Sequence, residues 1–334
     1  MVKRIGFFLI VAWILTLKAT LAGSASPEII EGAKREGTLM LYTSMNTPDV
    51  NGVFAAFQKK YPFVTPKNYT TRSAALLQRI LTEAQAGRHA ADVIQGNIFT
   101  LYVLSKKGIT AKYVSPEAAG IPVDFRDPNG HWTAVYQQLN VIGYNSKLVS
   151  PKEAPRSYED LLHPKWKGKM ALDDKQYVWF DGLLSVMGKE KGMEFMKRLA
   201  TQEIHFRSGQ TLLADLLAAG EFAVLINTRP DNMVDLKKKG APTEWVAPNP
   251  TTVNLLPIGV AARAPHPNAA RLFVDFVLSE EGQRVLGAQG KTPSRPKIPT
   301  TYPIPDVKLV VNDPAMSERL NEVAEVYKKV FNLP

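Results

Sequence analysis

Short apolar segments alternate with amphipathic segments along the first third of the chain. The apolar run Thr38–Tyr42 is typical of a strand, and Val64–Tyr69 and residues 92–94 are predicted as the next two strands. After Pro48, and again after Ser73, apolar residues recur at spacings of three and four, which predicts two helices that each bury one face. A repeat of strand, polar loop and helix is typical of a mostly parallel sheet covered by helices.

The same alternation returns in the second half of the chain. The predicted elements are a strand at Lys169–Leu172, helices near 180–187 and 192–200, a helix through 212–217 and a strand at 222–226. Gly220 is expected to end the third of these helices, because glycine is favoured just beyond a helix C-terminus. A strand and a helix are then predicted within residues 257–283, and a last helix over about 313–331.

Two extended stretches, residues 132–144 and 248–257, are interpreted as crossings between domains, and residues 291–305 as a proline-rich tether. The length of 334 residues also favours about two domains. We therefore predict an α/β fold with two lobes. Their predicted extents are 27–135 plus 257–300 for lobe 1 and 136–256 plus 301–334 for lobe 2.

The composition narrows the class of protein. With 45% hydrophobic and 22% charged residues, it is typical of an ordinary globular protein. The chain has no cysteine, which excludes disulfides, thiolate catalysis and metal sites with sulfur ligands. The formal net charge is +10, but the basic residues are spread along the chain rather than gathered in a block, so we expect no nucleic-acid surface.

The first residues have the pattern of an export signal. Lys3 and Arg4 precede an apolar run over residues 5–17, and small residues follow up to Ala22. The run is shorter than the roughly 20 residues needed to span a membrane. We predict that residues 1–22 are a cleaved signal peptide and that the mature protein is periplasmic, without a lipid anchor because no cysteine is present to carry one.

The familiar catalytic patterns are absent from the sequence. It contains no serine elbow, phosphate-binding glycine loop with lysine, dinucleotide fingerprint or pair of histidines at helical spacing. The five histidines are scattered singly, whereas metal sites need clustered ligands. Asp173 and Asp174 are adjacent carboxylates, but neighbours on a strand point to opposite faces. The sequence therefore favours a binding protein over an enzyme.

Six segments together resemble the periplasmic solute-binding proteins that serve ABC importers, in the branch that contains the ferric-ion-binding proteins. They follow the family's order over nearly all of the mature chain: LMLYTSMNTPDVNGVFAAFQKKYP, RSAALLQRILTEAQAGRHAADVIQGN, QLNVIGYNSKLV, HPKWKGKMALDD, LLAAGEFAVLIN and PIGVAARAPHPNAARLFVDFVLSEEGQ. The resemblance implies a type II periplasmic-binding fold, in which two α/β lobes close on a ligand in a hinge cleft. It also implies two partners in the inner membrane, a permease and its ATPase.

The metal ligands of that branch are not matched in this chain. The resemblance places the branch's iron ligands after the first strand, after the third strand, and as a tyrosine pair after the strand that follows AAGE. These positions fall here on Asn46, on Asn97, and on Arg229 with Pro230. Neutral amides are weak ligands for a trivalent cation and an arginine repels it, so we predict no metal ligand and no cofactor.

An arginine at this position suits an anion instead, because its planar fork of donors matches carboxylate and phosphate. Helix starts at Arg72 and Gln210 would add backbone N–H groups, although helix capping or a surface ion pair explains such residues as well. One of the two adjacent aspartates is expected to line the cleft. The predicted ligand-binding residues are Ser44, Asn46, Arg72, Ser73, Asn97, Tyr136, Asp174, Gln210, Asn227 and Arg229.

Three functions remain open on the sequence. The first is a monomeric periplasmic receptor that captures a small anionic organic solute and passes it to an ABC permease. The second keeps this class of protein but carries ferric iron, bound directly or as a chelate. The third is a periplasmic hydrolase or lyase that uses Asp173 or Asp174.

Overall fold

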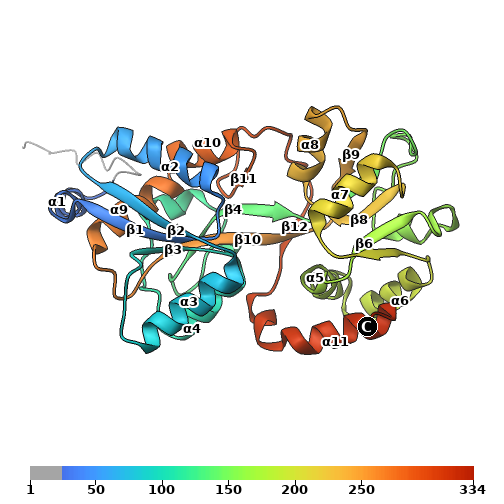
Figure 1. The fold of residues 1–334 in the computed structure, drawn as a ribbon, viewed down its shortest axis with the longest axis horizontal. Helices are drawn as coiled ribbons and strands as arrows, with labels where there is room; N and C mark the ends of the chain where they lie inside the picture. The colour runs from blue at the N-terminus through green and yellow to red at the C-terminus, as the bar shows by residue number, and fades with distance from the viewer. Residues whose placement is uncertain (1–24) are drawn as a thin grey trace, which may run out of the picture.

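The structure is a computed structural model that describes residues 25–334, so the predicted signal peptide, residues 1–22, lies outside the described residues. Within the described part, the strands form two sheets, each covered by helices on both faces (Figure 1). We call the part built on the seven-stranded sheet lobe 1 and the part built on the five-stranded sheet lobe 2. The predicted α/β fold with two lobes is therefore confirmed.

The sheet of lobe 1 is mixed, with strand order β11-β4-β10-β3-β1-β2 and β12 beside β10. Its first three strands are parallel, as predicted, whereas β10 runs antiparallel to β3 and β4. The strands are β1 (Thr38–Thr43), β2 (Thr65–Thr70), β3 (Val93–Gln95), β4 (Thr133–Leu139), β10 (Thr251–Val260), β11 (Thr292–Pro293) and β12 (Leu309–Val311). The helices are α1 (Pro27–Glu36), α2 (Thr47–Lys60), α3 (Ser73–Gln85), α4 (Ile98–Lys106), α9 (Pro267–Leu278) and α10 (Glu280–Ala288), with short 3₁₀ turns η1 (Pro116–Gly120) and η2 (Val123–Phe125).

The sheet of lobe 2 has strand order β7-β6-β8-β5-β9, with β6, β7 and β8 parallel to one another. Helices α7 and α8 cover one face, and α5, α6 and α11 cover the other (Figure 1). The strands are β5 (Val141–Asn145), β6 (Met170–Asp173), β7 (His205–Arg207), β8 (Val224–Thr228) and β9 (Thr243–Val246). The helices are α5 (Tyr177–Met187), α6 (Lys189–Ala200), α7 (Gln210–Ala219), α8 (Pro230–Lys238) and α11 (Leu320–Phe331), with 3₁₀ turns η3 (Glu159–Leu162), η4 (Pro164–Trp166) and η5 (Pro314–Arg319).

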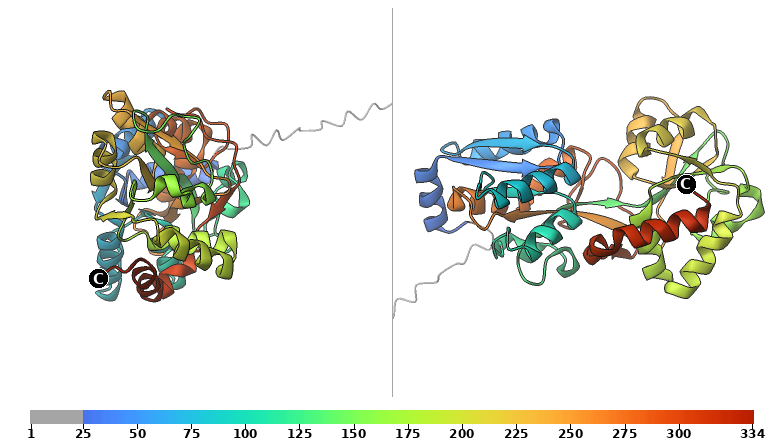
Figure 2. Two further views of the ribbon diagram at one scale, coloured as in Figure 1. Left: turned by 90° about the vertical axis from the view of Figure 1, so that its right-hand side faces the viewer. Right: turned by 60° about the horizontal axis from the view of Figure 1, so that its bottom comes forward.

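The two lobes meet at a narrow waist that β4 and β10 approach from lobe 1 (Figure 2). Val141 packs in the core of lobe 1 and the next residue, Ile142, in the core of lobe 2, so the first crossing lies at this point. Two of the predicted lobe boundaries, at positions 136 and 257, fall inside strands β4 and β10. We propose boundaries at Asn140 and within residues 247–250, where the chain passes from one sheet to the other.

A third connection between the lobes runs along residues 305–319. Its strand β12 pairs with β10, and its turn η5 packs against α4 of lobe 1. Across this contact the Tyr102 hydroxyl donates to Glu318 Oε1 at 2.9 Å. The expected helix over 313–331 is wrong over residues 313–319, which form the 3₁₀ turn η5 and its cap, because Arg319 leaves helical geometry at φ −122° and separates η5 from α11. Leu320, the first residue of α11, is 42% exposed.

A buried carboxyl group lies in the core of lobe 1. Asp275 on α9 is 4% exposed, and its two oxygens accept from the Tyr113 hydroxyl at 2.8 and 2.9 Å. Burial raises the pKa of Asp275 above its usual range, against the hydrogen bonds from Ser115 and Tyr113, which lower it. The group is therefore held in an environment that disfavours its charge.

Changing Asp275 to asparagine should flatten the pH dependence of stability. The pKa of this carboxyl is higher in the folded chain than the roughly 3.9 of an unfolded one, so its contribution is complete below about pH 4 and is lost as the pH rises through the folded-state pKa. The free energy of unfolding of Asp275→Asn, measured by urea titration relative to wild type, should therefore increase between pH 4 and 7. The exposed control Asp306→Asn should show no such trend, and a pH-independent difference for Asp275→Asn would contradict the prediction.

Candidate functional site

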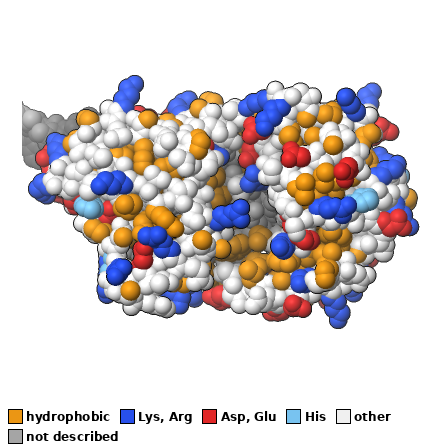
Figure 3. Space-filling view, viewed as in Figure 1, with side chains coloured by type: hydrophobic (Ala, Val, Ile, Leu, Met, Phe, Trp, Pro, Cys, Tyr) orange, Lys and Arg blue, Asp and Glu red, His pale blue; other side chains and the backbone are white. Residues whose placement is uncertain are grey.

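The carboxyl ends of the parallel strands in the two lobes face each other. In lobe 1 Thr43 lies beside Thr70 and Gln95, so β1, β2 and β3 end together at one edge. The antiparallel β10 enters lobe 1 over this edge, because its residues 258–260 pair with β3 in reverse order. In lobe 2 the first residue of β5, Val141, pairs with Thr228 at the end of β8. Figure 3 shows a crevice between the two lobes at this level.

Six helices begin at these two edges. Helices α2, α3 and α4 follow β1, β2 and β3, and α5, α7 and α8 follow β6, β7 and β8. The N–H groups of a first helical turn have no partner within the helix and carry partial positive charge, so helix starts of this kind favour an anion. In four of the six, α3, α5, α7 and α8, the residue before the helix makes no side-chain capping hydrogen bond.

The other two helix starts are capped by predicted ligand residues. Asn46 Oδ1 accepts from the backbone N–H of Asp49 at 2.9 Å. Asn97 Oδ1 accepts from the backbone N–H of Thr100 at 2.9 Å and from its hydroxyl at 2.8 Å. The side-chain oxygens of both asparagines therefore stabilise their own helices, and their Nδ2 groups are what remains for a ligand.

The other predicted residues of lobe 1 lie at the same edge. The backbone N–H of Ser44 donates to the carbonyl of Gln95 at 3.2 Å, which joins the ends of β1 and β3. Arg72 precedes α3 with its side chain exposed, and Ser73 is the first residue of that helix. Their placement after β2 matches the prediction, and a role in ligand binding stays a prediction.

Tyr136 on β4 lies within electrostatic reach of charged groups from both lobes. Burial raises the pKa of its phenol above the usual range, Asp49 of α2 raises it further, and Arg229 before α8 lowers it. The Asp49 carboxylate pairs with Lys291 Nζ at 2.7 Å. The residues 49, 136, 229 and 291 therefore gather where the two lobes meet.

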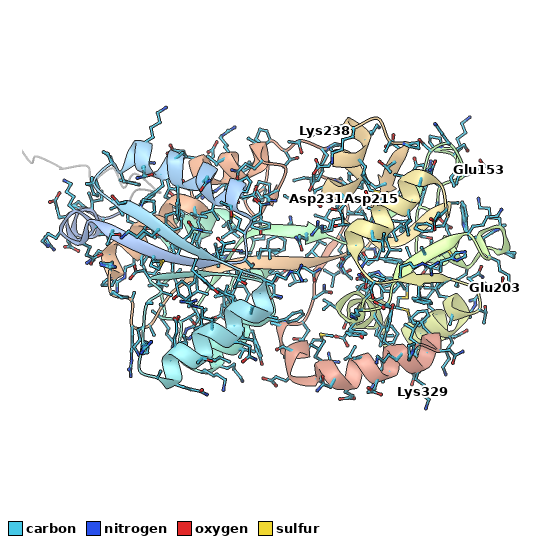
Figure 4. All side chains as sticks on the ribbon, viewed as in Figure 1. Glu153, Glu203, Asp215, Asp231, Lys238 and Lys329 are labelled. Carbon is cyan, nitrogen blue, oxygen red and sulfur yellow. The ribbon has the colours of Figure 1, made fainter. Side chains whose placement is uncertain are left out.

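Arg229 is held from one side by its own helix. Its Nη2 donates to Asn232 Oδ1 at 2.8 Å, and its Nε lies 3.3 Å from Asp231 Oδ1. Figure 4 shows Asp231 at the end of α8 that is level with the crossing strands, and Lys238 at the opposite end. Because Nε and Nη2 form one edge of the guanidinium group, the outer edge formed by Nη1 and Nη2 is left for a bidentate acceptor.

Asn227 and Gln210 present side-chain oxygens near the ends of β8 and β7. Asn227 is 2% exposed, and its Nδ2 donates to Gln176 Oε1 at 2.7 Å. Its Oδ1 and the Oε1 of Gln210 are buried without a hydrogen-bond partner among residues 25–334. Buried polar atoms of this kind are costly unless they are paired, so they are suited to hydrogen-bond donors of a ligand.

The two adjacent aspartates bind loops of lobe 2. Asp173 accepts from the backbone N–H groups of Lys175 and Gly209, both at 2.9 Å, and so joins the loops that precede α5 and α7. Asp174 Oδ2 accepts from the Ser208 hydroxyl at 2.5 Å. The other oxygen, Asp174 Oδ1, is buried and has no hydrogen-bond partner among residues 25–334. It is therefore the aspartate oxygen at this edge that is left for a ligand.

Sequence reasoning missed the charged partners of the site. Asp49 and Lys291 lie 2.7 Å apart although they are far apart in the chain, and Lys291 was placed in the tether. Asp231 was missed although it directly follows the Arg-Pro pair. Among residues 25–334, no group of three or more histidine, aspartate and glutamate side chains could hold a metal ion. In the same range no helix is long and apolar enough to span a membrane.

Comparison with protein-family models matches residues 90–318 to the family described as "Bacterial extracellular solute-binding protein". A curated relative, Iron uptake protein A1 of a Synechocystis strain, is 25% identical over 264 residues, which is 74% of this chain and 72% of the relative.

Two solved structures share the fold. Trichodesmium FutA, in complex with iron and citrate, has a TM-score of 0.77 and 22% identity over 88% of this chain and 99% of the other. AfuA from Actinobacillus pleuropneumoniae, with fructose-6-phosphate bound, has a TM-score of 0.70 and 23% identity over 90% of this chain and 100% of the other. These likenesses bear out the predicted type II periplasmic-binding fold.

Proposed function

Because the chain belongs to the bacterial extracellular solute-binding protein family, we propose that it is the periplasmic receptor of an ABC importer and captures a small anionic organic solute between its lobes. The solute carries a carboxylate, phosphate or phosphonate group. The receptor then delivers it to a permease in the inner membrane, which an ATPase subunit drives. The receptor acts as a monomer and performs no chemistry on the solute.

The observation that carries the proposal is the combination of Arg229 with uncapped helix starts. The outer edge of the Arg229 guanidinium group can bind two oxygens of one anionic group. Four helices begin at the facing edges without a side-chain cap, so their free N–H groups favour negative charge in the same space. Arg72, before α3 in the opposite lobe, adds a second cation.

The candidates other than the two arginines would orient the rest of the solute. The buried oxygens of Asn227, Gln210 and Asp174 accept hydrogen bonds, and the free Nδ2 groups of Asn46 and Asn97 donate them. Closure of the lobes would remove water from around the anion, which strengthens each of these contacts. A solute that carries hydroxyl or amino groups next to its anionic group would satisfy both kinds of site.

A second candidate is a ferric chelate. It is favoured by a relative named for iron uptake and by the similar structure that holds iron with citrate. A chelate with an excess of carboxylate groups is itself an anion and would use the same arginines. This candidate needs no protein ligand on the metal.

The test is a binding screen on the mature protein. Thermal unfolding is recorded with sugar phosphates, phosphonates, di- and tricarboxylates and ferric citrate, each with and without the anionic group where analogues exist. A true solute at a hundredfold excess over its Kd should add about 2.7 kcal/mol of stability. Stabilisation by an organic anion alone supports the first candidate, and stabilisation by citrate only with iron supports the second. Stabilisation by neutral sugars or by cations instead would refute both.

A further inference from the structure

A pocket of about 220 Å³ opens on lobe 1 at the edge of the sheet opposite to the crevice. It lies where α3 and α4 end, next to the first residue of β3 and the last residue of β10. Both helices begin at the crevice, so the length of α3 alone separates the two places by about 20 Å. The pocket is therefore distinct from the proposed solute site.

The floor of the pocket is apolar and its rim is basic. Ile80 and Ile94 line it from below, and Arg88, Lys107 and Arg263 surround it with exposed side chains. None of these three cations forms an ion pair with a carboxylate in the described part of the chain. Three positive charges around one small pocket therefore lack a counter-ion on the protein.

The one carboxylate that lines this pocket is bound elsewhere. Glu83 pairs with Arg79 Nε at 2.7 Å and accepts from the Tyr42 hydroxyl at 3.0 Å. On the other side, Arg263 Nη1 donates to His89 Nε2 at 3.2 Å, and this hydrogen bond holds the Arg263 side chain at the pocket.

Helix ends explain part of this cluster. Arg88 and Lys107 follow the last turns of α3 and α4, where cations are favoured by the helix dipole. Arg263 lies in the loop between β10 and α9, away from any helix C-terminus, and yet approaches His89. The helix dipoles therefore explain the positions of Arg88 and Lys107. They do not explain why Arg263 lies at the same pocket.

We propose that this pocket is a second, peripheral anion site that binds a phosphate group through Arg88, Lys107 and Arg263. The group comes either from free phosphate or from the head group of an anionic phospholipid, since both present non-bridging phosphate oxygens to the rim. The apolar floor would exclude water beneath the bound group and so strengthen its contacts with the arginines.

The test is made in an Arg229→Ala background, so that the crevice does not contribute. Binding of inorganic phosphate is measured by calorimetry at constant ionic strength, and binding to vesicles of phosphatidylcholine with and without phosphatidylglycerol is measured by sedimentation. Arg88→Gln with Arg263→Gln should weaken binding at least about tenfold. The matched control Lys328→Gln with Lys329→Gln removes the same charge from α11, at the far side of lobe 2 (Figure 4), and should change binding less than twofold.

Saturable binding of phosphate at one equivalent that needs Arg88 and Arg263 supports the free ion as the source. Vesicle binding that needs the same two residues and phosphatidylglycerol, without saturable phosphate binding, supports the lipid head group. If neither probe binds, or if the control variant loses as much binding as the pocket variant, the proposal is wrong. A failure of the solute screen leaves this result unaffected, because the two sites are separate.

Discussion

Replacing Arg229 with alanine should weaken binding of the anionic solute about thirtyfold or more. Arg229 is the cation at the facing edges whose outer guanidinium edge is left open by its neighbours Asp231 and Asn232. Truncating one partner of a hydrogen-bonded charge pair in a desolvated site costs about 2–5 kcal/mol, and each 1.4 kcal/mol is tenfold in Kd. The measurement is calorimetry with the solute that the binding screen identifies.

The design of this experiment separates charge from geometry. Arg229→Lys keeps the charge but loses the fork, so it should recover only part of the affinity. Lys238→Ala removes a cation from the far end of the same helix and should change Kd less than threefold. Unchanged affinity of Arg229→Ala would show that the solute is held by other groups, Arg72 first among them. Loss of affinity in all three variants would point to long-range attraction instead of a bound arginine.

Replacing Asp92 with alanine should lower the free energy of unfolding by about 3–5 kcal/mol. Asp92 has no exposed surface. Its oxygens accept from the backbone N–H groups of Met40 and His266, both at 2.7 Å, and from His266 Nδ1 at 2.9 Å. Alanine would leave these donors without their acceptor and open a small cavity between β1, β3 and the start of α9. Urea denaturation at pH 7 measures the loss.

Two further variants show whether the loss of stability in Asp92→Ala comes from its hydrogen bonds. Asp92→Asn keeps one acceptor oxygen but turns an N–H₂ group toward a donor, so it should fall between wild type and Asp92→Ala. Glu281→Ala breaks an exposed ion pair with Lys60 and should cost about 1 kcal/mol or less. If Asp92→Ala costs no more than this surface control, the three hydrogen bonds contribute little to stability.

The order of strands and helices was predictable where one face of each element is apolar and the other polar. Four helices were not predicted, α1, α4, α8 and α10, and the first two of them lack this pattern. Helix α4, residues 98–106, has the aromatic residues Phe99 and Tyr102 on the side where a polar face would be expected. These residues are apolar there because η5 packs against this side of the helix. In α1 the buried residues are Gly32 and Ala33, which give no apolar stripe. Helix α1 is fixed instead by Glu36, which accepts from the N–H groups of Asn268 and Ala269 at the start of α9.

The candidate site was predictable only in its position along the chain. Asn227 and Arg229 were predicted to follow a strand and so to lie at the carboxyl ends of the strands of a sheet. They lie there in the structure. Their partners were not predictable, because pairs such as Asp49 with Lys291 form between segments remote in sequence. Asn46 and Asn97 were assigned to the ligand, whereas their oxygens cap α2 and α4. Whether these residues bind a solute stays a prediction.

The position of α11 in the core of lobe 2 constrains the order in which the protein can fold. Tyr327 is fully buried, and its hydroxyl donates to the carbonyl of Asp173 at 2.8 Å, while its ring packs against Phe180 of α5. The strands of this lobe are all complete by residue 246, but the space they enclose is filled only when residues 320–331 have been made. During synthesis, lobe 2 therefore stays incomplete and exposes apolar surface until residue 331 has been added. Such a delay favours a chain that is kept unfolded until synthesis has passed this helix.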